Sequence, residues 1–213
     1  MAEMEKLREM IINGNDKGIA DHVVKLVDRG QTPGSILNDA LIPAMDIVGD
    51  LYQKGEYFLP ELLISARAMQ RALDVIKPKL AEQGVKNVGK VVIGTVQGDL
   101  HDLGKNLVNM TLEGAGFEVI DLGVDVPPDK FVAAIKEHDP MVVGMSALIT
   151  TTMPAMKETI EAITSAGLRS KVKIMVGGAP ITSEYAVEIG ADYYGPDSTD
   201  GKNYARDVAT GKV

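Results

Sequence analysis

Apolar side chains recur at the three- and four-residue spacing of amphipathic helices through the first 82 residues, where β-branched runs are scarce. Two short helices are predicted on either side of the polar segment 13–16. A third is expected to begin with Thr32 as N-cap and Pro33 in its first turn, and to end near Gly55. A fourth is expected to begin at Leu59. Four helices with short connections predict a small four-helix bundle.

After residue 87 continuous apolar runs replace the helical spacing, as in strands that are covered on both faces. The predicted strands are 91–96, 117–122, 141–146, 172–176 and, more weakly, 191–194. The predicted helices between and after them are 104–113, 129–137, 154–166, 183–189 and one from residue 200. This alternation predicts a flavodoxin- or Rossmann-like, five-stranded, parallel, doubly wound sheet of order 2-1-3-4-5. The whole chain is thus expected to be α/β, with domains 1–86 and 87–213.

The composition restricts the kinds of partner and functional site that the chain can have. The 22 basic and 30 acidic residues give a formal net charge of -8, which argues against a nucleic-acid partner. The absence of cysteine and the presence of only three histidines argue against thiolate, disulfide, zinc–cysteine and multi-histidine metal sites. No stretch approaches the roughly 18 apolar residues of a membrane span. The alternating charges of residues 1–8 are unlike a signal peptide, so a cytoplasmic location is expected.

Polar segments follow the first and third predicted strands, where a doubly wound sheet binds its ligands. A phosphate loop is one interpretation, but the spacing from Gly98 to Gly104 is one residue too long. Asn106 also stands where that loop has a magnesium-binding Ser or Thr. Ser146 ends the third strand, where a phosphoacceptor domain of the response-regulator type would have an aspartate. Both resemblances to nucleotide or phosphate chemistry therefore fail at specific residues.

His101 has unusual neighbours: Asp99 two residues before it and Asp102 directly after it. A histidine that binds a metal through one ring nitrogen generally has the other nitrogen held by a carboxylate. Asp99 is placed to hold it. The alternative is that Asp99 or Asp102 caps the next helix and His101 is simply solvated, and the residues alone favour that alternative. His22 and His138 lie on predicted surface helices and receive no role.

The pattern as a whole resembles a known family. Three motifs follow the predicted strands in order: Asp99-x-His101-x-x-Gly104, Ser146-x-Leu148 and Gly177-Gly178. Together they resemble the signature of cobalamin-binding domains in which a protein histidine is the lower cobalt ligand. The helical half is similar to the four-helix cap of the methionine synthase cobalamin module and of the small corrinoid proteins of methyltransferase systems, at 48–52, 58–60 and 65–69.

The resemblance implies roles for three residues around the metal. His101 is implied to bind cobalt from below, in place of the cofactor's own base, which is the base-off, His-on arrangement. Asp99 is implied to accept a hydrogen bond from the other ring nitrogen. Methionine synthase has a serine as the third member of this relay, and Thr152 stands at the matching position here. A threonine hydroxyl can make the same bond, so we expect Asp99 and Thr152 to relay protons to the lower ligand.

Further positions are implied to bind the cobalamin or related corrinoid. Its displaced nucleotide tail needs walls of small residues and hydroxyls beside the sheet. These positions and their motif neighbours are Gly98, Leu100, Asp102, Gly104, Ser146, Leu148, Thr150, Gly177 and Gly178. Tyr52, a phenylalanine in methionine synthase, and Leu59 are implied to cover the upper face of the corrin. Two alternatives stay open: a tight turn explains Gly177-Gly178, and core packing explains Leu59.

The function that the resemblance implies is that of a corrinoid methyl carrier, which is not catalytic alone. Its cobalt would accept a methyl group from a methylamine, methanol, methoxyaromatic or betaine donor on one methyltransferase. It would deliver that group to an acceptor such as tetrahydrofolate or a thiol on a second methyltransferase, and a reductive activase is a further expected partner. The alternatives are a cobalamin-dependent sensor, which would append a DNA-binding domain, and the cobalamin subunit of a mutase, which would lack the cap.

Overall fold

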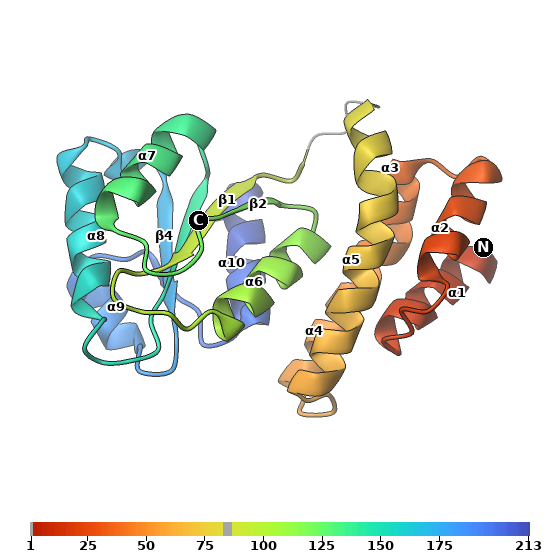
Figure 1. Ribbon diagram of the computed structural model, residues 1–213, viewed down its shortest axis with the longest axis horizontal. Coiled ribbons are helices and arrows are strands. Elements are labelled where there is room, and N and C mark those ends of the chain that lie inside the picture. Colours follow the sequence, from red (N-terminus) through yellow and green to blue (C-terminus); the bar gives the residue numbers. More distant parts are fainter. Residues whose placement is uncertain (1, 83–86) are drawn as a thin grey trace. The chain divides into compact units, whose positions relative to one another are not determined.

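The computed structural model describes residues 2–82 and 87–213, and the chain forms two compact units (Figure 1). The helical unit reaches Asn87 and takes in Gly114–Gly116, and the sheet unit consists of Val88–Glu113 and Phe117–Val213. The sequence predicts a boundary within residues 82–87, of which 83–86 lie outside the described residues.

The described part of the helical unit has four helical rods, as its apolar stripes predict. The first two are α1 (Ala2–Ile12) and α2 (Ile19–Asp28), and the last is α5 (Leu59–Glu82), which continues past Pro78. The third rod runs through α3 (Pro33–Ile36), the π-helical turn η1 (Leu37–Leu41) and α4 (Ile42–Gln53). The hydroxyl of Thr32 accepts the N–H of Ser35, so the predicted N-cap of this rod is confirmed.

The π-helical turn has a local cause in the sequence. Pro43 has no N–H, so in a regular helix the carbonyl of Asp39 would lack its partner. The guanidinium of Arg8 donates to this carbonyl instead, from Nε at 2.9 Å and also from Nη2. In the same turn the N–H of Ile42 bonds to the carbonyl of Leu37, one residue further back than in an α-helix. A long-range contact from α1 therefore compensates for a proline inside the third rod.

The helical unit has one apolar core, built from the predicted stripes. The larger buried side chains are Leu7, Ile11, Ile19, Val23, Leu26, Ile36, Leu41, Met45, Val48, Leu62, Met69, Leu73 and Ile76. Burying a side chain of this size contributes roughly 1.5–3 kcal/mol. Four of the residues in this set come from α5 alone, which explains why this helix contacts α1, α2 and α4.

The sheet unit confirms the predicted fold class, because its five parallel strands have the order β2-β1-β3-β4-β5. The strands are β1 (Lys90–Thr95), β2 (Glu118–Asp121), β3 (Val142–Ser146), β4 (Lys173–Gly177) and β5 (Tyr193–Tyr194). The helices are α6 (Leu103–Gly114), α7 (Pro128–His138), α8 (Pro154–Ser165), the 3-10 turn η2 (Arg169–Lys171), α9 (Ser183–Ile189) and α10 (Ser198–Ala209). The last helix begins before residue 200 because the carboxylate of Asp197 caps the N–H groups of Thr199 and Asp200.

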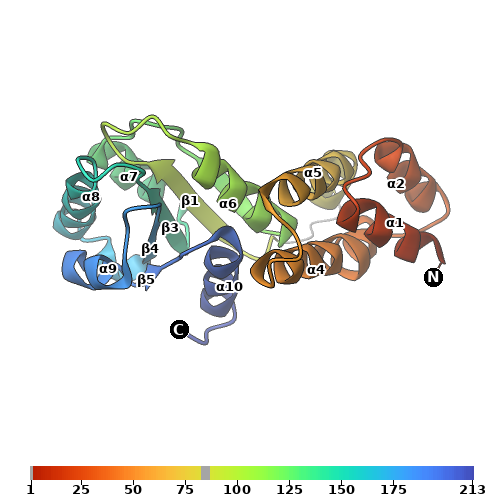
Figure 2. The same ribbon diagram turned by 90° about the horizontal axis from the view of Figure 1, so that it is seen from below.

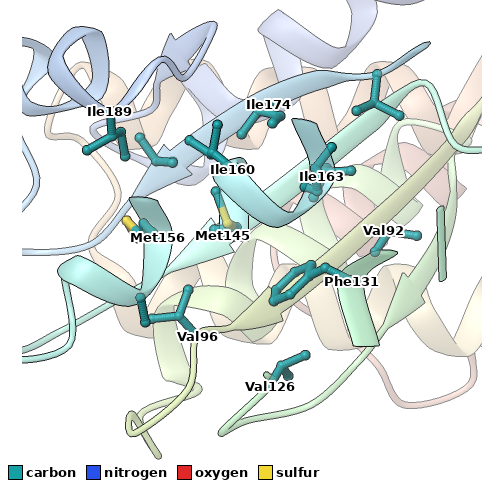
Figure 3. Close-up of a cluster of buried hydrophobic side chains, with 14 of the residues drawn as sticks. Val92, Val96, Val126, Phe131, Met145, Met156, Ile160, Ile163, Ile174 and Ile189 are labelled. Carbon is teal, nitrogen blue, oxygen red and sulfur yellow. The ribbon is translucent and has the colours of Figure 1, made fainter. Parts of the chain in front are cut away.

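Helices cover both faces of the sheet. On one face α7, α8 and α9 bury a cluster against the three central strands, with Phe131, Met145, Met156 and Ile174 among its members (Figure 3). On the other face lie α6 and α10 (Figure 2). The central strands are buried on both sides, as their continuous apolar runs predict. Among the residues that the structure describes, no helix is long and apolar enough to cross a membrane.

Candidate functional site

The three predicted motifs meet at one edge of the sheet. In the register of the parallel strands, Thr95 at the end of β1 lies beside Ser146 at the end of β3, and Ser146 lies beside Gly177 at the end of β4. The loops that follow these strands therefore emerge next to one another. This is the carboxyl edge, where doubly wound sheets bind their ligands.

A tight turn begins the loop after β1. The N–H of Asp99 bonds to the carbonyl of Val96 at 3.1 Å, which closes a four-residue turn. Gly98 occupies the third position with φ of +84°, a conformation that favours glycine. A β-carbon on Gly98 would also lie 3.4 Å from the side chain of Thr152. Since 3.4 Å is an ordinary van der Waals contact, the backbone conformation of the turn, rather than lack of space, favours glycine here.

The carboxylate of Asp99 is fully buried and accepts four hydrogen bonds. Oδ1 accepts the main-chain N–H of His101 at 3.0 Å and lies 2.7 Å from Nδ1 of the same residue. Oδ2 accepts the N–H of Leu148 at 2.7 Å and the hydroxyl of Thr152 at 2.8 Å. Burial by itself raises the pKa of this carboxyl, but the four hydrogen bonds outweigh burial and hold the pKa well below its usual range. Asp99 is therefore ionised at neutral pH.

The imidazole of His101 is held by one nitrogen and open at the other. Its side chain is 53% exposed. Because an ionised carboxylate can only accept, the hydrogen bond to Asp99 puts the proton on Nδ1. Nε2 makes no hydrogen bond or ion pair to any described residue. The hydroxyl of Thr95 fixes the carbonyl of His101 at 2.9 Å. In its neutral form the ring thus offers the lone pair of Nε2 on an accessible nitrogen in a fixed position.

Asp102 is not part of this network. Its carboxylate accepts the side-chain amide of Asn106 at 3.0 Å, one turn along α6. The two acidic neighbours of His101 therefore have different partners. Asp99 bonds the ring nitrogen of His101, and Asp102 bonds a side chain in the first turn of α6.

Large apolar side chains are exposed in the two loops that carry these groups. Leu100 is 71% exposed and Leu103 is 59% exposed, on either side of His101. Leu148 and Ile149 are exposed in the loop after β3, which holds Asp99. Large exposed apolar patches mark surfaces that bind a ligand or partner, so these side chains are candidates for contact with a ligand. Their presence around an available imidazole fits a large ligand with apolar faces.

The donor set restricts how a metal could bind. Within residues 2–82 and 87–213, no group of three or more His, Asp or Glu side chains lies close enough together to hold a metal ion. Fewer than three such side chains could therefore hold a metal at His101, and its remaining ligands would have to come from a cofactor or water. A corrin, which surrounds cobalt with its own nitrogens, meets this requirement.

The predicted glycines differ in what surrounds them. A β-carbon on Gly178, where φ is +129°, would lie 1.9 Å from the carbonyl oxygen of Ala147, and one on Gly177 would lie 2.9 Å from that of Gly195. Close packing of neighbouring loops therefore requires both glycines. Nothing lies within 4 Å of such a carbon on Gly104. Open space above the first turn of α6 leaves room for a ligand.

The remaining predicted positions make no hydrogen bond to His101 among the residues that the structure describes. Ser146 is half-buried at the end of β3, and Thr150 is exposed in the following loop. Tyr52 in α4 and Leu59 at the start of α5 are both half-buried within the helical unit. The proposed contacts of these four residues with a corrinoid stay predictions.

Two residues of the site are absent from the sequence prediction. Thr95 is a buried hydroxyl at the end of an apolar strand, a signal that could have been recognised. Asp125 comes from the loop after β2 and accepts the N–H of Gly98 at 2.7 Å. No sequence pattern marks Asp125, because its contact depends on how two distant loops pack.

Comparison with known proteins agrees with this geometry. Models described as "B12 binding domain" match residues 89–200 and residues 3–77. A corrinoid protein of Desulfitobacterium hafniense is 36% identical over 211 residues, which cover 98% of each chain. The chain belongs to the B12-binding corrinoid protein family. Trimethylamine corrinoid protein 1 of Methanosarcina mazei is 40% identical over 197 residues, covering 92% of this chain and 91% of the relative.

A solved relative extends the likeness to three dimensions. The methanol:cobalamin methyltransferase complex MtaBC from Methanosarcina barkeri contains a chain that matches with a TM-score of 0.87 and 30% sequence identity. The match covers 99% of this chain and 80% of that chain. Family membership thus confirms the resemblance that the three motifs and the helical cap indicate.

Proposed function

We propose that this protein is a corrinoid methyl carrier of a methyltransferase system. A bound corrinoid would supply the cobalt that accepts and releases the methyl group. The observation that carries the proposal is the pairing of an accessible His101 Nε2 with a buried, ionised Asp99. Family membership supports the same function.

In this proposal His101 would hold the cobalt of the corrinoid through Nε2, in place of the cofactor's own base. Asp99 keeps the proton on Nδ1, so the lone pair of Nε2 faces outward. A carboxylate partner also raises the basicity of the imidazole and thereby strengthens it as a ligand. Thr152 and the N–H of Leu148 hold Asp99 from its far side, at 2.8 Å and 2.7 Å. The relay thus joins the lower ligand to the loop after β3.

We assign the rest of the carboxyl edge to binding the corrinoid. Leu100 and Leu148 offer exposed apolar surface, and Gly104 leaves open space for close approach. The remaining tail-binding positions that we propose are Gly98, Asp102, Ser146, Thr150, Gly177 and Gly178. Tyr52 and Leu59 of the helical unit are proposed to cover the upper face and exclude water from the cobalt.

A carrier of this kind depends on other proteins. We propose a donor methyltransferase, an acceptor methyltransferase and a reductive activase as partners. The relatives include a trimethylamine corrinoid protein and a chain of a methanol:cobalamin methyltransferase complex. Methylamines and methanol are accordingly the first donors to test, and methoxylated aromatics and betaines come next.

The histidine assignment is tested by absorption spectroscopy of the protein reconstituted with a corrinoid. The wild type should show the base-off, His-on spectrum, and His101→Ala should lose it. His138→Ala is the matched control, because this histidine lies at the far end of α7, and its spectrum should equal that of the wild type. A spectrum unchanged in His101→Ala would overturn the assignment.

The carrier role is tested by methyl transfer. The reduced holoprotein should become methylated only when a cognate donor methyltransferase and its substrate are both present. His101→Ala should be methylated more slowly or less completely. A holoprotein that no candidate methyltransferase methylates, but that binds DNA or supports radical rearrangement, would favour the sensor or the mutase instead.

A further inference from the structure

Asp125 has an unusual backbone conformation for its place in the chain. It lies between β2 and α7 with φ of +52°, and the other described non-glycine residue with positive φ is Asp139, with φ of +48°. Asp139 is the C-cap of α7, where a left-handed residue is common. Asp125 ends no helix. A left-handed residue in such a place persists only where surrounding contacts hold it.

Those contacts reach the end of β1 and the loop that carries His101. Oδ1 of Asp125 accepts the N–H of Gly98 at 2.7 Å, and the N–H of Asp125 donates to the carbonyl of Asp99 at 2.9 Å. The next residue continues the attachment, because the N–H of Val126 donates to the carbonyl of Thr95 at 3.0 Å. Side chain and main chain of Asp125 therefore hold two successive residues of the turn that precedes His101.

The position of this turn decides where the Asp99 carboxylate points. Asp99 bonds both the main-chain N–H and Nδ1 of His101, so a rotation of the turn would change both bonds. Gly98 has no side chain to restrict such a rotation, and glycine adopts positive and negative φ about equally readily, so its φ of +84° does not by itself fix the turn. The carboxylate of Asp125 is the described side chain that bonds the N–H of Gly98.

We propose that Asp125 is a positioning residue for the lower ligand: it fixes the Gly98–Asp99 turn and thereby keeps the proton of His101 on Nδ1. The inference rests on the proposed function in that His101 is taken to bind cobalt. Asp125 adds the loop after β2 to the site, which Asp99 and Thr152 build from the loops after β1 and β3. The tautomer of His101 can be measured without any corrinoid.

Two substitutions separate the side chain of Asp125 from its backbone. Asp125→Gly allows the left-handed conformation and keeps the N–H that bonds Asp99, but removes the acceptor for Gly98. Asp125→Asn also tolerates that conformation and keeps a neutral, weaker oxygen acceptor. Asp139→Gly is the matched control, since it makes the same change at the other left-handed aspartate, at the end of α7.

The readout is the ratio of the Nδ1–H to the Nε2–H tautomer of His101, from imidazole ¹⁵N chemical shifts of the full-length protein without corrinoid. We expect Asp125→Gly to lower the ratio about threefold or more, the size of effect that one weakened hydrogen bond produces. Asp125→Asn should lie between it and the wild type, and Asp139→Gly should match the wild type. Thermal unfolding checks that each variant is folded.

An unchanged tautomer ratio in folded Asp125→Gly would overturn the inference. If that variant does not fold, Asp125→Asn decides alone, and a ratio equal to that of the wild type overturns it. The spectrum of the reconstituted wild type separates this inference from the proposed function. Loss of the His-on spectrum in the wild type would refute histidine ligation, whereas an insensitive tautomer would refute only the role of Asp125.

Discussion

Asp99 shows how one buried charge can organise a site. Its carboxylate lies at 0% exposure, where an unpaired charge would be strongly destabilising, and four donors compensate for the lost water. One of these donors is Nδ1 of His101. The same interactions that make burial of Asp99 acceptable therefore also select the tautomer of His101.

The ionisation of Asp99 makes stability depend on pH. Its pKa is lower in the folded chain than the ordinary value of 3.8, so the ionised carboxylate stabilises the fold above that pH. This contribution is lost as the pH falls below 3.8 toward the folded pKa. At pH 7, Asp99→Asn should lower the free energy of unfolding by about 3 kcal/mol, as for other broken buried charge networks.

Urea unfolding at several pH values measures this difference between wild type and variant. The difference should be constant from pH 7 to about pH 5 and shrink below pH 4. Asp102→Asn is the control, because its exposed carboxylate bonds only the side chain of Asn106 among the interactions described, and should change stability by less than about 0.5 kcal/mol. A difference that does not shrink in acid would contradict an ionised Asp99.

At the scale of the elements, the site depends on how strands end rather than on the strands themselves. β1, β3 and β4 end in register, and each continues into a loop that contains a glycine at a motif position or a buried polar group. Two of the motif glycines are confined by neighbouring main chain, and Gly104 at the start of α6 is not. The same residue type thus serves two different purposes within one motif set.

Substitution by alanine should separate these purposes. Gly178→Ala brings a β-carbon to 1.9 Å from the carbonyl oxygen of Ala147 at a φ of +129°, so it should destabilise the sheet unit by several kcal/mol, more than about 3. Gly104→Ala meets no atom and lies in a helix, so it should stabilise the corrinoid-free protein by up to about 1 kcal/mol.

Thermal unfolding and corrinoid titration test the pair together. Gly104→Ala should bind corrinoid more weakly than the wild type although its fold is at least as stable, because the added methyl group occupies space that we assign to the cofactor. Equal affinity in Gly104→Ala would show that the open space there is not used. A stable Gly178→Ala would show that the loop after β3 can move aside.

At the scale of the whole molecule, the residues that we propose to contact the corrinoid come from two compact units, and each unit has its own buried apolar side chains. His101, Asp99 and Thr152 all belong to the sheet unit, whereas Tyr52 and Leu59 belong to the helical unit. Corrinoid binding should therefore stabilise the sheet unit directly, and the helical unit only if its two residues cover the cofactor.

Amide hydrogen exchange measures the two units separately. At a corrinoid concentration about 100 times Kd, the slowest amides of β1, β3 and β4 should exchange about 100-fold more slowly, which corresponds to about 2.7 kcal/mol. His101→Ala should show a smaller gain at the same concentration. Slower exchange in α4 and α5 would support the roles of Tyr52 and Leu59. No slowing in the sheet unit would contradict binding at the carboxyl edge.

The fold class was predictable because it depends on repeating patterns. Helical spacing in one half and continuous apolar runs in the other specify a bundle and a doubly wound parallel sheet, and all five strands occur where those runs lie. The weakest run, 191–194, yields only the two-residue strand Tyr193–Tyr194. The π-helical turn was missed, because it depends on Arg8 reaching the carbonyl left free by Pro43.

By itself the sequence determined the fold class, because that follows from apolar residues at fixed spacing, and its resemblance to cobalamin-binding domains indicated the family and His101 as the candidate ligand. Only the tertiary structure decided between the two interpretations of its acidic neighbours, because Asp99 and Asp102 lie two residues and one residue from His101, both near enough along the chain to reach it. Contacts from Leu148 and Thr152, more than 40 residues away, select Asp99. Asp125 joined the site for the same reason: packing of distant loops, which no local pattern encodes, places its carboxylate on the turn.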